Sequence, residues 1–406
     1  MRDRQSSGFF APRMSRFQPS PSQIASARVR ELVAAGQDII KLTAGEPDFP
    51  TPEIAKAAAD ACMEANEIRY TPINGLEPMR RAAIHKFERD NGLSYGLDQI
   101  TVGSGTKQVI FNALMCSVSE GDECIVPSPY WTSYPDMVKL AGGTPVIVDC
   151  DEASGFKMSA AQLQAAITPK TKWLIFCSPS NPTGATYSRD HLRELAQVLK
   201  QHPHVHILCD DVYEHLVFDG REFGTFAEIE PELYDRTVTT NGVSKAYSMT
   251  GWRLGFAGGP ADIIANMSKM QSQSSAGVNA VAQAAAAAAL MGPLDLVHER
   301  TRNLQDRRDL LFDALSQNPL LRCQRPEGAM YIFCSCEGAI GKTTPDGKRI
   351  ENDTDFVMYL LDSVGVAVVQ GAAYGLSPYF RASFVATEEQ IRDGAKRIQA
   401  ACAALT

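Results

Sequence analysis

Two residue patterns alternate regularly along this chain between positions 98 and 260. Short runs rich in β-branched and apolar residues alternate with stretches of helical periodicity, such as "KQVIFNALMCSV" and "SRDHLRELAQVLKQ". The runs are "QITV" (99–102), "DECIVP" (122–127), "TPVIVD" (144–149), "KWLIFC" (172–177), "VHILCD" (205–210), "RTVTT" (236–240) and "LGFAGG" (254–259). Strands separated by helices are typical of a mostly parallel sheet with helices on both faces, so we expect an α/β fold.

Two domains are expected, because 406 residues exceed what a single hydrophobic core usually supports. After a long helical stretch, the runs "EGAMYIFCSC", "VGVAVVQG" and "FRASFV" and a polar insert at 338–355 predict a smaller α+β domain. The N-terminal segment ends in the Gly/Pro loop "TAGEPDFPTP" and is expected to join it. The predicted units are an N-terminal arm with part of the small domain (1–55), a large domain (56–310) and a small C-terminal domain (311–406).

Charge and cysteine spacing exclude several classes of protein. The formal net charge of −8 argues against a nucleic-acid partner, which requires a basic face. The ten cysteines are scattered through apolar runs without C-x-x-C or zinc-finger spacing, so we expect neither a metal site nor a disulfide framework. No segment has eighteen consecutive apolar residues and the N-terminus lacks the apolar core of a signal peptide, which predicts no membrane association and a cytoplasmic location.

Polar and aromatic turns follow five of the expected strands. Ligands of open α/β sheets bind beyond the carboxyl ends of the strands, so these turns are expected to lie along one edge and form a site. They are "GSGTK" (103–107), "SPYW" (128–131), "SPSNPTG" (178–184), "DDVYE" (210–214) and "NGVSK" (241–245).

The turn "GSGTK" between a strand and a helix offers free backbone N–H groups to an anion. Its sequence continues neither as the G-x-G-x-x-G of dinucleotide-binding folds nor as a P-loop, which disfavours a nicotinamide-dependent dehydrogenase. The turn could therefore bind the phosphate of another kind of cofactor. Alternatively, it could be a plain tight turn without a ligand.

Four further residues each have an ordinary interpretation and a chemical one. Asp210 could be a helix N-cap, Trp131 a core aromatic, Asn181 a turn residue and Lys245 a solvated loop cation. Alternatively, the carboxylate could pair with a protonated ring nitrogen, the indole could stack on a ring, and the amide could donate to a ring oxygen together with Tyr213. With a phosphate turn and a lysine amine, these groups describe a site for pyridoxal 5′-phosphate.

The motifs that carry this chemistry resemble those of one family. They are "LTAGEPDFPTP", "RYTPINGLEPMR", "SPYWTSYP", "SPSNPTGA", "CDDVYEHLVF", "SKAYSMTGWRLGF" and "FRASF". In this order they are similar to the class I (fold-type I) aminotransferases that depend on pyridoxal phosphate, over nearly the whole chain. The likeness is greatest to bacterial aspartate aminotransferases of the kind that also act on prephenate.

The resemblance implies a role for each matching residue. Lys245 would form the Schiff base with the cofactor and then act as the base that moves the substrate proton. The implied ligands of the cofactor phosphate are Gly105, Thr106, Lys107, Ser244 and Arg253. The implied partners of the cofactor ring are Trp131, Asn181, Asp210 and Tyr213. Tyr70 would reach the phosphate of a neighbouring subunit, which implies a homodimer. Asp210 and Tyr213 would share the catalytic work with Lys245.

For the substrate, the resemblance implies that Arg381 grips the α-carboxylate as a bidentate fork, with help from the main chain of Gly45. Lys107 would bind the distal carboxylate of aspartate or glutamate, and Trp131 and Asn181 would border the substrate. The expected reaction converts L-aspartate and 2-oxoglutarate to oxaloacetate and L-glutamate. The chain departs from the pattern at Gln18, where relatives that accept prephenate have a lysine, although Ser20 and Ser22 are retained as polar groups.

Three alternatives stay open at this point. The same fold and cofactor could serve an aminotransferase for an aromatic or prephenate-type amino acid, or a pyridoxal-phosphate-dependent lyase. Transcription regulators that carry an aminotransferase-like domain form a non-catalytic alternative. Those regulators need a DNA-binding domain ahead of that domain, and fewer than 45 residues precede "GEPDFP" here.

Overall fold

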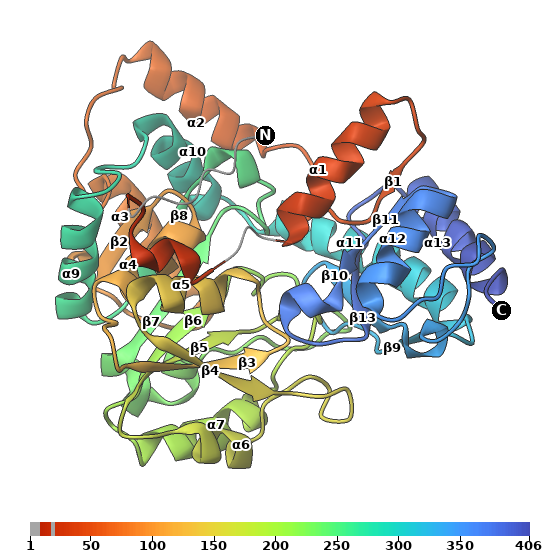
Figure 1. Cartoon of the computed structure of the whole chain (residues 1–406). Coiled ribbons are helices and arrows are strands. Elements are labelled where there is room, and N and C mark those ends of the chain that lie inside the picture. The colour runs from red at the N-terminus through yellow and green to blue at the C-terminus, as the bar shows by residue number, and fades with distance from the viewer. Residues whose placement is uncertain (1–8, 18–20) are drawn as a thin grey trace.

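The computed structural model describes residues 9–17 and 21–406. Figure 1 shows two lobes, one built around a large central sheet and one formed by the C-terminal part of the chain together with the first helix. Gln18 and Ser20 lie outside the described residues, and so does the side chain of Ser22.

The central sheet has seven strands in the order β2-β8-β7-β6-β5-β3-β4. Their bounds are β2 Ile100–Gly103, β3 Glu123–Ser128, β4 Thr144–Asp149, β5 Thr171–Cys177, β6 His206–Asp210, β7 Thr237–Gly242 and β8 Gly255–Gly258. All neighbouring pairs are parallel except the two that β8 makes with β2 and β7. The expected mostly parallel sheet is therefore confirmed, with one antiparallel strand.

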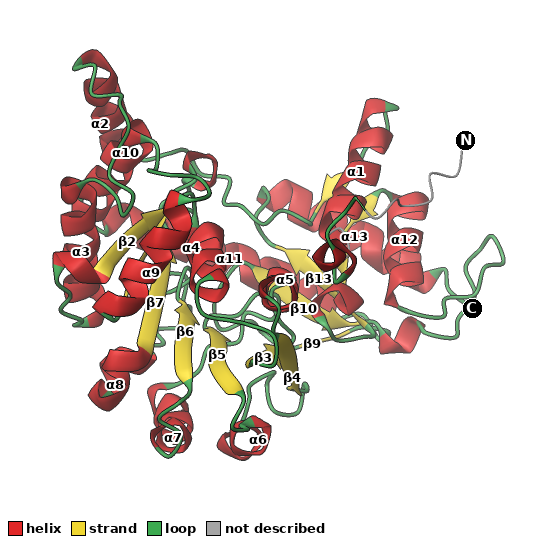
Figure 2. Cartoon of the chain, turned by 60° about the vertical axis from the view of Figure 1, so that its left-hand side comes forward, coloured by secondary structure: helices red, strands yellow, loops and turns green. Residues whose placement is uncertain are grey.

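Helices cover both faces of this sheet. Their bounds are α2 Glu53–Glu64, α3 Glu77–Asn91, α4 Thr106–Met115, α5 Ser133–Ala141, α6 Ala160–Ala166, α7 Arg189–Lys200, α8 Phe226–Ile229, α9 Ala261–Ser272 and α10 Ala280–Met291. Helices α6, α7 and α8 bury their apolar residues against one face, as Figure 2 shows, and α4, α5 and α9 against the other. In α7, Leu192, Leu195, Ala196 and Leu199 recur at helical spacing and are all buried, and Ser188 caps the first turn.

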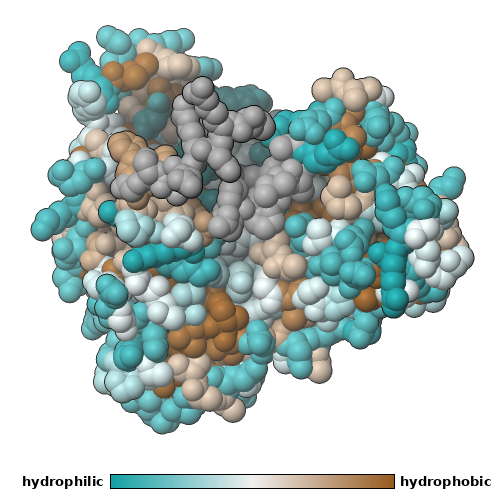
Figure 3. All heavy atoms as spheres, in the orientation of Figure 1, coloured by the Kyte–Doolittle hydropathy of each residue, from teal (hydrophilic) through white to brown (hydrophobic). Residues whose placement is uncertain are grey.

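The second lobe contains a four-stranded antiparallel sheet in the order β12-β13-β10-β9 and a two-stranded parallel sheet of β1 and β11. The strands are β1 Ile40–Lys41, β9 Arg322–Cys323, β10 Tyr331–Ser335, β11 Val366–Ala367, β12 Val369–Gln370 and β13 Tyr379–Ser383. The helices are α1 Pro21–Ala34, α11 Asp295–Ser316, α12 Asp353–Val364 and α13 Glu388–Ala403. Figure 3 shows a mostly hydrophilic surface on this lobe, whose apolar residues gather inside in one large cluster.

One disulfide joins Cys323 and Cys334, so the expectation that the cysteines stay unpaired is wrong at this place. The two residues lie directly opposite each other on the antiparallel strands β9 and β10, with their Cα atoms 4.4 Å apart. Opposed residues of antiparallel strands come within disulfide reach irrespective of their distance in the chain. Their spacing in the sequence matches no known cysteine motif, which is why the pair could not be anticipated.

No single helix of the described residues is long and apolar enough to span a membrane. Helices α10 and α11 reach that length and composition only together, across a bend of 85°. The apolar residues of α10 are largely buried in the cluster that also contains α2 and α3.

Candidate active site

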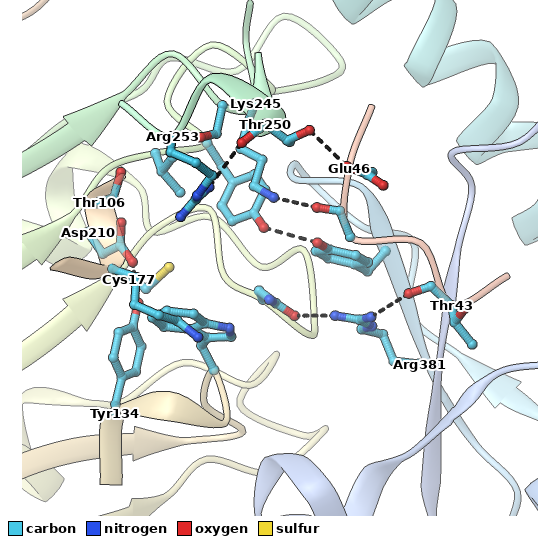
Figure 4. A pocket seen from close by; sticks show the side chains of 18 of the residues that line it. Thr43, Glu46, Thr106, Tyr134, Cys177, Asp210, Lys245, Thr250, Arg253 and Arg381 are labelled. Carbon is cyan, nitrogen blue, oxygen red and sulfur yellow. Dashed lines mark hydrogen bonds between the residues drawn. The ribbon is translucent and has the colours of Figure 1, made fainter. Parts of the chain in front are cut away.

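A cavity of about 770 Å³ lies between the two lobes, at the carboxyl ends of the central strands. It brings together the following residues expected from the sequence: Gly45, Thr106, Lys107, Trp131, Asn181, Asp210, Tyr213, Ser244, Lys245, Arg253 and Arg381. Figure 4 shows that their side chains converge on one space from both lobes. Gly105 directly precedes Thr106, whereas Tyr70 does not line this cavity.

A cradle for an anion lies at the N-terminus of α4. Gly105 precedes the helix with φ of +86°, and a Cβ at this position would collide with the guanidinium of Arg253. Arg253 itself adopts φ of 52°, and its Nη1 donates to the carbonyl of Thr250 at 3.0 Å. Because glycine allows the guanidinium to approach the positive end of the helix dipole, two sources of positive potential coincide here. With Ser244 in the same wall, this arrangement suits a phosphate group.

Asp210 is the last residue of β6, and only one of its two carboxylate oxygens accepts a hydrogen bond among the described residues. Its Oδ2 accepts a hydrogen bond of 2.7 Å from the hydroxyl of Tyr134, whereas its buried Oδ1 has no hydrogen-bond partner among the described residues. Burial raises the pKa of Asp210 to about 6, although the Tyr134 hydroxyl, the backbone N–H of Val212 and the Lys245 ammonium act in the opposite direction. A buried, unpaired carboxylate oxygen calls for a cationic or donating partner, such as the protonated nitrogen of a pyridine ring.

Lys245 follows β7 and extends toward the second lobe. Its Nζ donates to the carbonyl oxygen of Gly45 and lies 5.7 Å from the centroid of the Tyr213 ring. The Tyr213 hydroxyl is 3.0 Å from the hydroxyl of Tyr331, which comes from β10. Burial, followed by the proximity of Tyr331, raises the pKa of Tyr213, so its phenol stays protonated and can donate at neutral pH.

Arg381 of β13 is held rigidly in the wall formed by the second lobe. Its Nη1 donates to Oδ1 of Asn181 and its Nη2 to the carbonyl of Thr43, both at 3.0 Å. The guanidinium lies 4.2 Å from the ring centroid of Tyr331 and 5.1 Å from that of Tyr374. The side chain is only 6% exposed, and its Nε lacks a hydrogen-bond partner among the described residues. A fixed, partly unpaired guanidinium of this kind is suited to bind a carboxylate.

Lys107 and Trp131 contact each other in the large lobe. The Nζ of Lys107 lies 4.7 Å from the centroid of the Trp131 ring, a cation–π arrangement. Burial and the neighbouring Arg253 lower the pKa of Lys107. The cavity therefore contains a second cation besides Arg381 that could bind an anionic group of a substrate.

Sequence reasoning missed several residues of the site, among them Tyr134 and Tyr331. Tyr134 is completely buried and stands in the quoted segment "SPYWTSYP", three residues after Trp131. Tyr331 stands in "EGAMYIFCSC". Both act through contacts with residues 76 to 118 positions away, and no local spacing signals such contacts.

Comparison with known proteins gives one consistent result. Residues 37–398 match the model of the family described as aminotransferase class I and II. The chain is 51% identical to an aspartate/prephenate aminotransferase of Cereibacter sphaeroides, covering 98% of this chain and 100% of that protein. It is 50% identical to an aspartate aminotransferase of Rhizobium meliloti over 95% of this chain and 96% of that one.

Solved structures agree with these relatives. The aspartate aminotransferase structure from Rhizobium meliloti superposes with a TM-score of 0.95 at 49% identity, covering 98% of this chain and 99% of that chain. The aspartate aminotransferase of Thermus thermophilus with maleate gives a TM-score of 0.89 at 36% identity, with 97% and 99% coverage.

Proposed function

The chain belongs to the class I and II aminotransferases, and from this premise we propose that it transfers the amino group of L-aspartate to 2-oxoglutarate with pyridoxal 5′-phosphate as cofactor. The observation that carries the proposal is that the cavity that Lys245 enters contains Arg381 and Lys107, two cations outside the anion cradle of Arg253; the exposed Arg30 also lines this cavity. Two cations match the two carboxylates of a dicarboxylic amino acid, and the relatives named as aspartate aminotransferases support the same substrate.

The residues of the cavity fit the proposed cofactor. Its phosphate would be held by Ser244, Arg253 and the N–H groups of the turn that begins α4, where helix dipole and guanidinium coincide. Its ring nitrogen would pair with the free Oδ1 of Asp210, which satisfies an otherwise orphaned buried acceptor. Asn181 and Tyr213 would donate to the ring oxygen and Trp131 would cover the ring face. When bound, pyridoxal phosphate supplies an electron-withdrawing ring that stabilises negative charge on the substrate α-carbon.

The protein's own side chains orient the substrate and move its proton. Arg381, fixed by Thr43 and Asn181, binds the α-carboxylate and thereby sets the orientation of the bonds at the α-carbon. Lys107 binds the distal carboxylate. The Nζ of Lys245 accepts the proton of the α-carbon and later returns a proton, for which its flexible side chain is suited.

We also propose a homodimer in which each subunit completes the cofactor site of the other. Tyr70 is fully exposed, so it could bind a phosphate only in a second copy of the chain. Several large apolar side chains of α2, its following loop and the end of α10 are exposed as well: Ile54, Met63, Ile68 and Met291. Exposed apolar residues gathered in this way are typical of subunit interfaces.

A second candidate substrate is prephenate, because the Cereibacter sphaeroides relative is named for both activities. Gln18 replaces the lysine that prephenate-accepting relatives are expected to have, which favours 2-oxoglutarate over prephenate as the acceptor. Turnover of aspartate with prephenate in place of 2-oxoglutarate tests this alternative.

A single-turnover panel tests the proposal. The purified, cofactor-loaded enzyme is mixed with one amino acid at a time, without an acceptor, and the visible absorbance of the cofactor is followed. L-Aspartate and L-glutamate should change the spectrum at least about tenfold faster than L-alanine or L-phenylalanine, since one lost ion pair costs at least about 1.4 kcal/mol. A faster reaction with aromatic amino acids would replace the proposed substrate, and no spectral change with any of them would refute the transaminase assignment.

A further inference from the structure

A cluster of buried charged residues lies beside the cavity, between α3 and the loop that follows β6. Lys86 and Asp90 come from α3, while Glu214 and His215 directly follow Tyr213 in the chain. Lys86 forms an ion pair with Oε1 of Glu214, and Nε2 of His215 lies 3.2 Å from both Asp90 Oδ2 and Glu214 Oε1. We call these four residues the brace network.

A neutral residue completes the brace network, whose side chains are almost fully buried. Asn91 accepts from the Lys86 ammonium at 2.6 Å and donates to Oε2 of Glu214 at 2.9 Å. The side chains of Lys86 and Glu214 are 1% and 3% exposed. Asp90, Glu214 and His215 also offer ligand atoms within 4.8 Å of one another, as a metal site would, but the Lys86 ammonium already supplies the positive charge there.

Two side chains of α11 connect this region to both catalytic loops. Thr301 donates to the carbonyl of His215 at 2.9 Å, and Arg300 donates to the carbonyl of Tyr247 at 3.2 Å. His215 stands two residues after Tyr213, and Tyr247 stands two residues after Lys245. The rings of His215 and Tyr247 pack edge to face with centroids 6.5 Å apart. The loop of Tyr213 and the loop of Lys245 are therefore held against each other on the side facing away from the cavity.

Stability alone does not account for such a cluster. Removing charges from water costs several kcal/mol per ion, and apolar replacements of similar volume are often neutral or stabilising. Hydrogen bonds, unlike apolar contacts, are directional, and those of Asn91 with Lys86 and Glu214 fix α3 relative to the loop that follows β6. The charges of the network are also firmly set: the pKa of Glu214 is raised by burial but lowered more strongly by Lys86 and His215, so the carboxylate stays ionised.

We propose that the brace network positions Tyr213 and Lys245 for catalysis, which makes Lys86, Asp90, Glu214 and His215 positioning residues that do not touch the substrate. The inference rests on the proposed function, because it assumes that Tyr213 and Lys245 act on the cofactor and substrate. It explains why Lys86 and Asp90 lie beside Glu214 and His215, which follow them by 124 or more positions and border the two catalytic loops.

The test uses Glu214→Gln, which keeps the shape and the hydrogen bond to Asn91 but removes the charge. A second variant, K86M/E214Q, removes both charges of the central pair and so avoids an uncompensated ammonium. For each cofactor-loaded variant, kcat and KM for aspartate, the thermal midpoint and the visible circular dichroism of the bound cofactor, which reports the orientation of its ring, are measured.

We expect Glu214→Gln to lower kcat by about 10- to 100-fold with KM changed less than about threefold, because small displacements of catalytic groups have effects of this size. The double variant should recover the thermal midpoint but not kcat, and both variants should alter the circular dichroism. If kcat returns together with the midpoint, or if both variants keep wild-type kcat and dichroism, the network serves stability alone and the inference is refuted.

Should Glu214→Gln fail to fold, Thr301→Val makes the same test at the edge of the network, since it removes the hydroxyl that bonds the carbonyl of His215 and, within α11, the carbonyl of Val297. Loss of kcat with an unchanged midpoint would support the inference, and unchanged kcat would refute it. Wild-type turnover of aspartate is measured first, so failure of the proposed function is recognised separately.

Discussion

Replacing Tyr134 by phenylalanine should disturb the cofactor site through a single hydrogen bond. The buried Tyr134 hydroxyl donates to Oδ2 of Asp210 at 2.7 Å, and this contact opposes the effect of burial, which raises the Asp210 pKa to a net value of about 6. A hydrogen bond to a charged group contributes about 1.5–3 kcal/mol. Because one pKa unit corresponds to about 1.4 kcal/mol, Tyr134→Phe should raise the pKa of Asp210 in the cofactor-free protein by about 1–2 units.

The raised pKa of Asp210 should change the pH dependence of cofactor affinity in a definite direction. Only the ionised Asp210 carboxylate attracts a protonated ring nitrogen, so affinity for pyridoxal phosphate should fall as pH drops through the pKa of Asp210. In the wild type this decline should centre near the Asp210 pKa of about 6, and in Tyr134→Phe it should move upward by about 1–2 pH units. The dissociation constant is measured by fluorescence titration of the cofactor-free protein from pH 5 to 9.

A matched control separates this effect from the ionisation of the cofactor itself, whose phosphate also titrates near pH 6. Tyr130 lies in the same segment, and its side chain makes no hydrogen bond among the described residues, so Tyr130→Phe should follow the wild-type curve. If the acid limb of Tyr134→Phe also coincides with that of the wild type, the assignment of Tyr134 as the group that tunes Asp210 is refuted.

Three further substitutions test the other assignments. Arg381→Lys should lower kcat/KM for aspartate by about 10- to 100-fold, since a lysine cannot form the bidentate contact; an unchanged value would mean that the α-carboxylate binds elsewhere. Lys107→Met should lower kcat/KM at least about tenfold for aspartate but by less than about threefold for alanine, which lacks a distal carboxylate; equal losses would contradict its role in specificity. Tyr70→Phe should weaken pyridoxal phosphate binding about tenfold without changing the thermal midpoint of the cofactor-free protein, and unaltered binding would argue against a shared site.

The sequence predicts the fold well because its signals are local. Each β-branched run of the central region corresponds to a strand, and the structure shifts their boundaries by only one or two residues in most cases, as for β3 at Glu123–Ser128. The antiparallel direction of β8 was not anticipated, since its sequence carries no information on the direction of pairing. Alternation of strand and helix therefore reveals the layers of the fold, but not every pairing within them.

The place of a residue in the cavity was predictable where the residue stands at or shortly after the end of a strand, as Asp210 and Lys245 do. It was not predictable where function depends on a contact between distant segments. Tyr134 donates a hydrogen bond to Asp210, which lies 76 positions later in the chain. Lys86 forms an ion pair with Glu214, and the sequence of its helix gives no sign of this partner. The disulfide between Cys323 and Cys334 was not predictable for the same reason, because it depends on the register in which two strands pair.

We propose that Lys245 and the two substrate-binding cations of this cavity carry out the transfer of an amino group from L-aspartate. The most direct test mixes the cofactor-loaded enzyme with excess L-aspartate in the absence of any acceptor and measures the oxaloacetate released. The proposal predicts one oxaloacetate per subunit, with no further release until 2-oxoglutarate is added, and none from Lys245→Ala. Absence of oxaloacetate from the wild type, or stoichiometric release from Lys245→Ala, would contradict it.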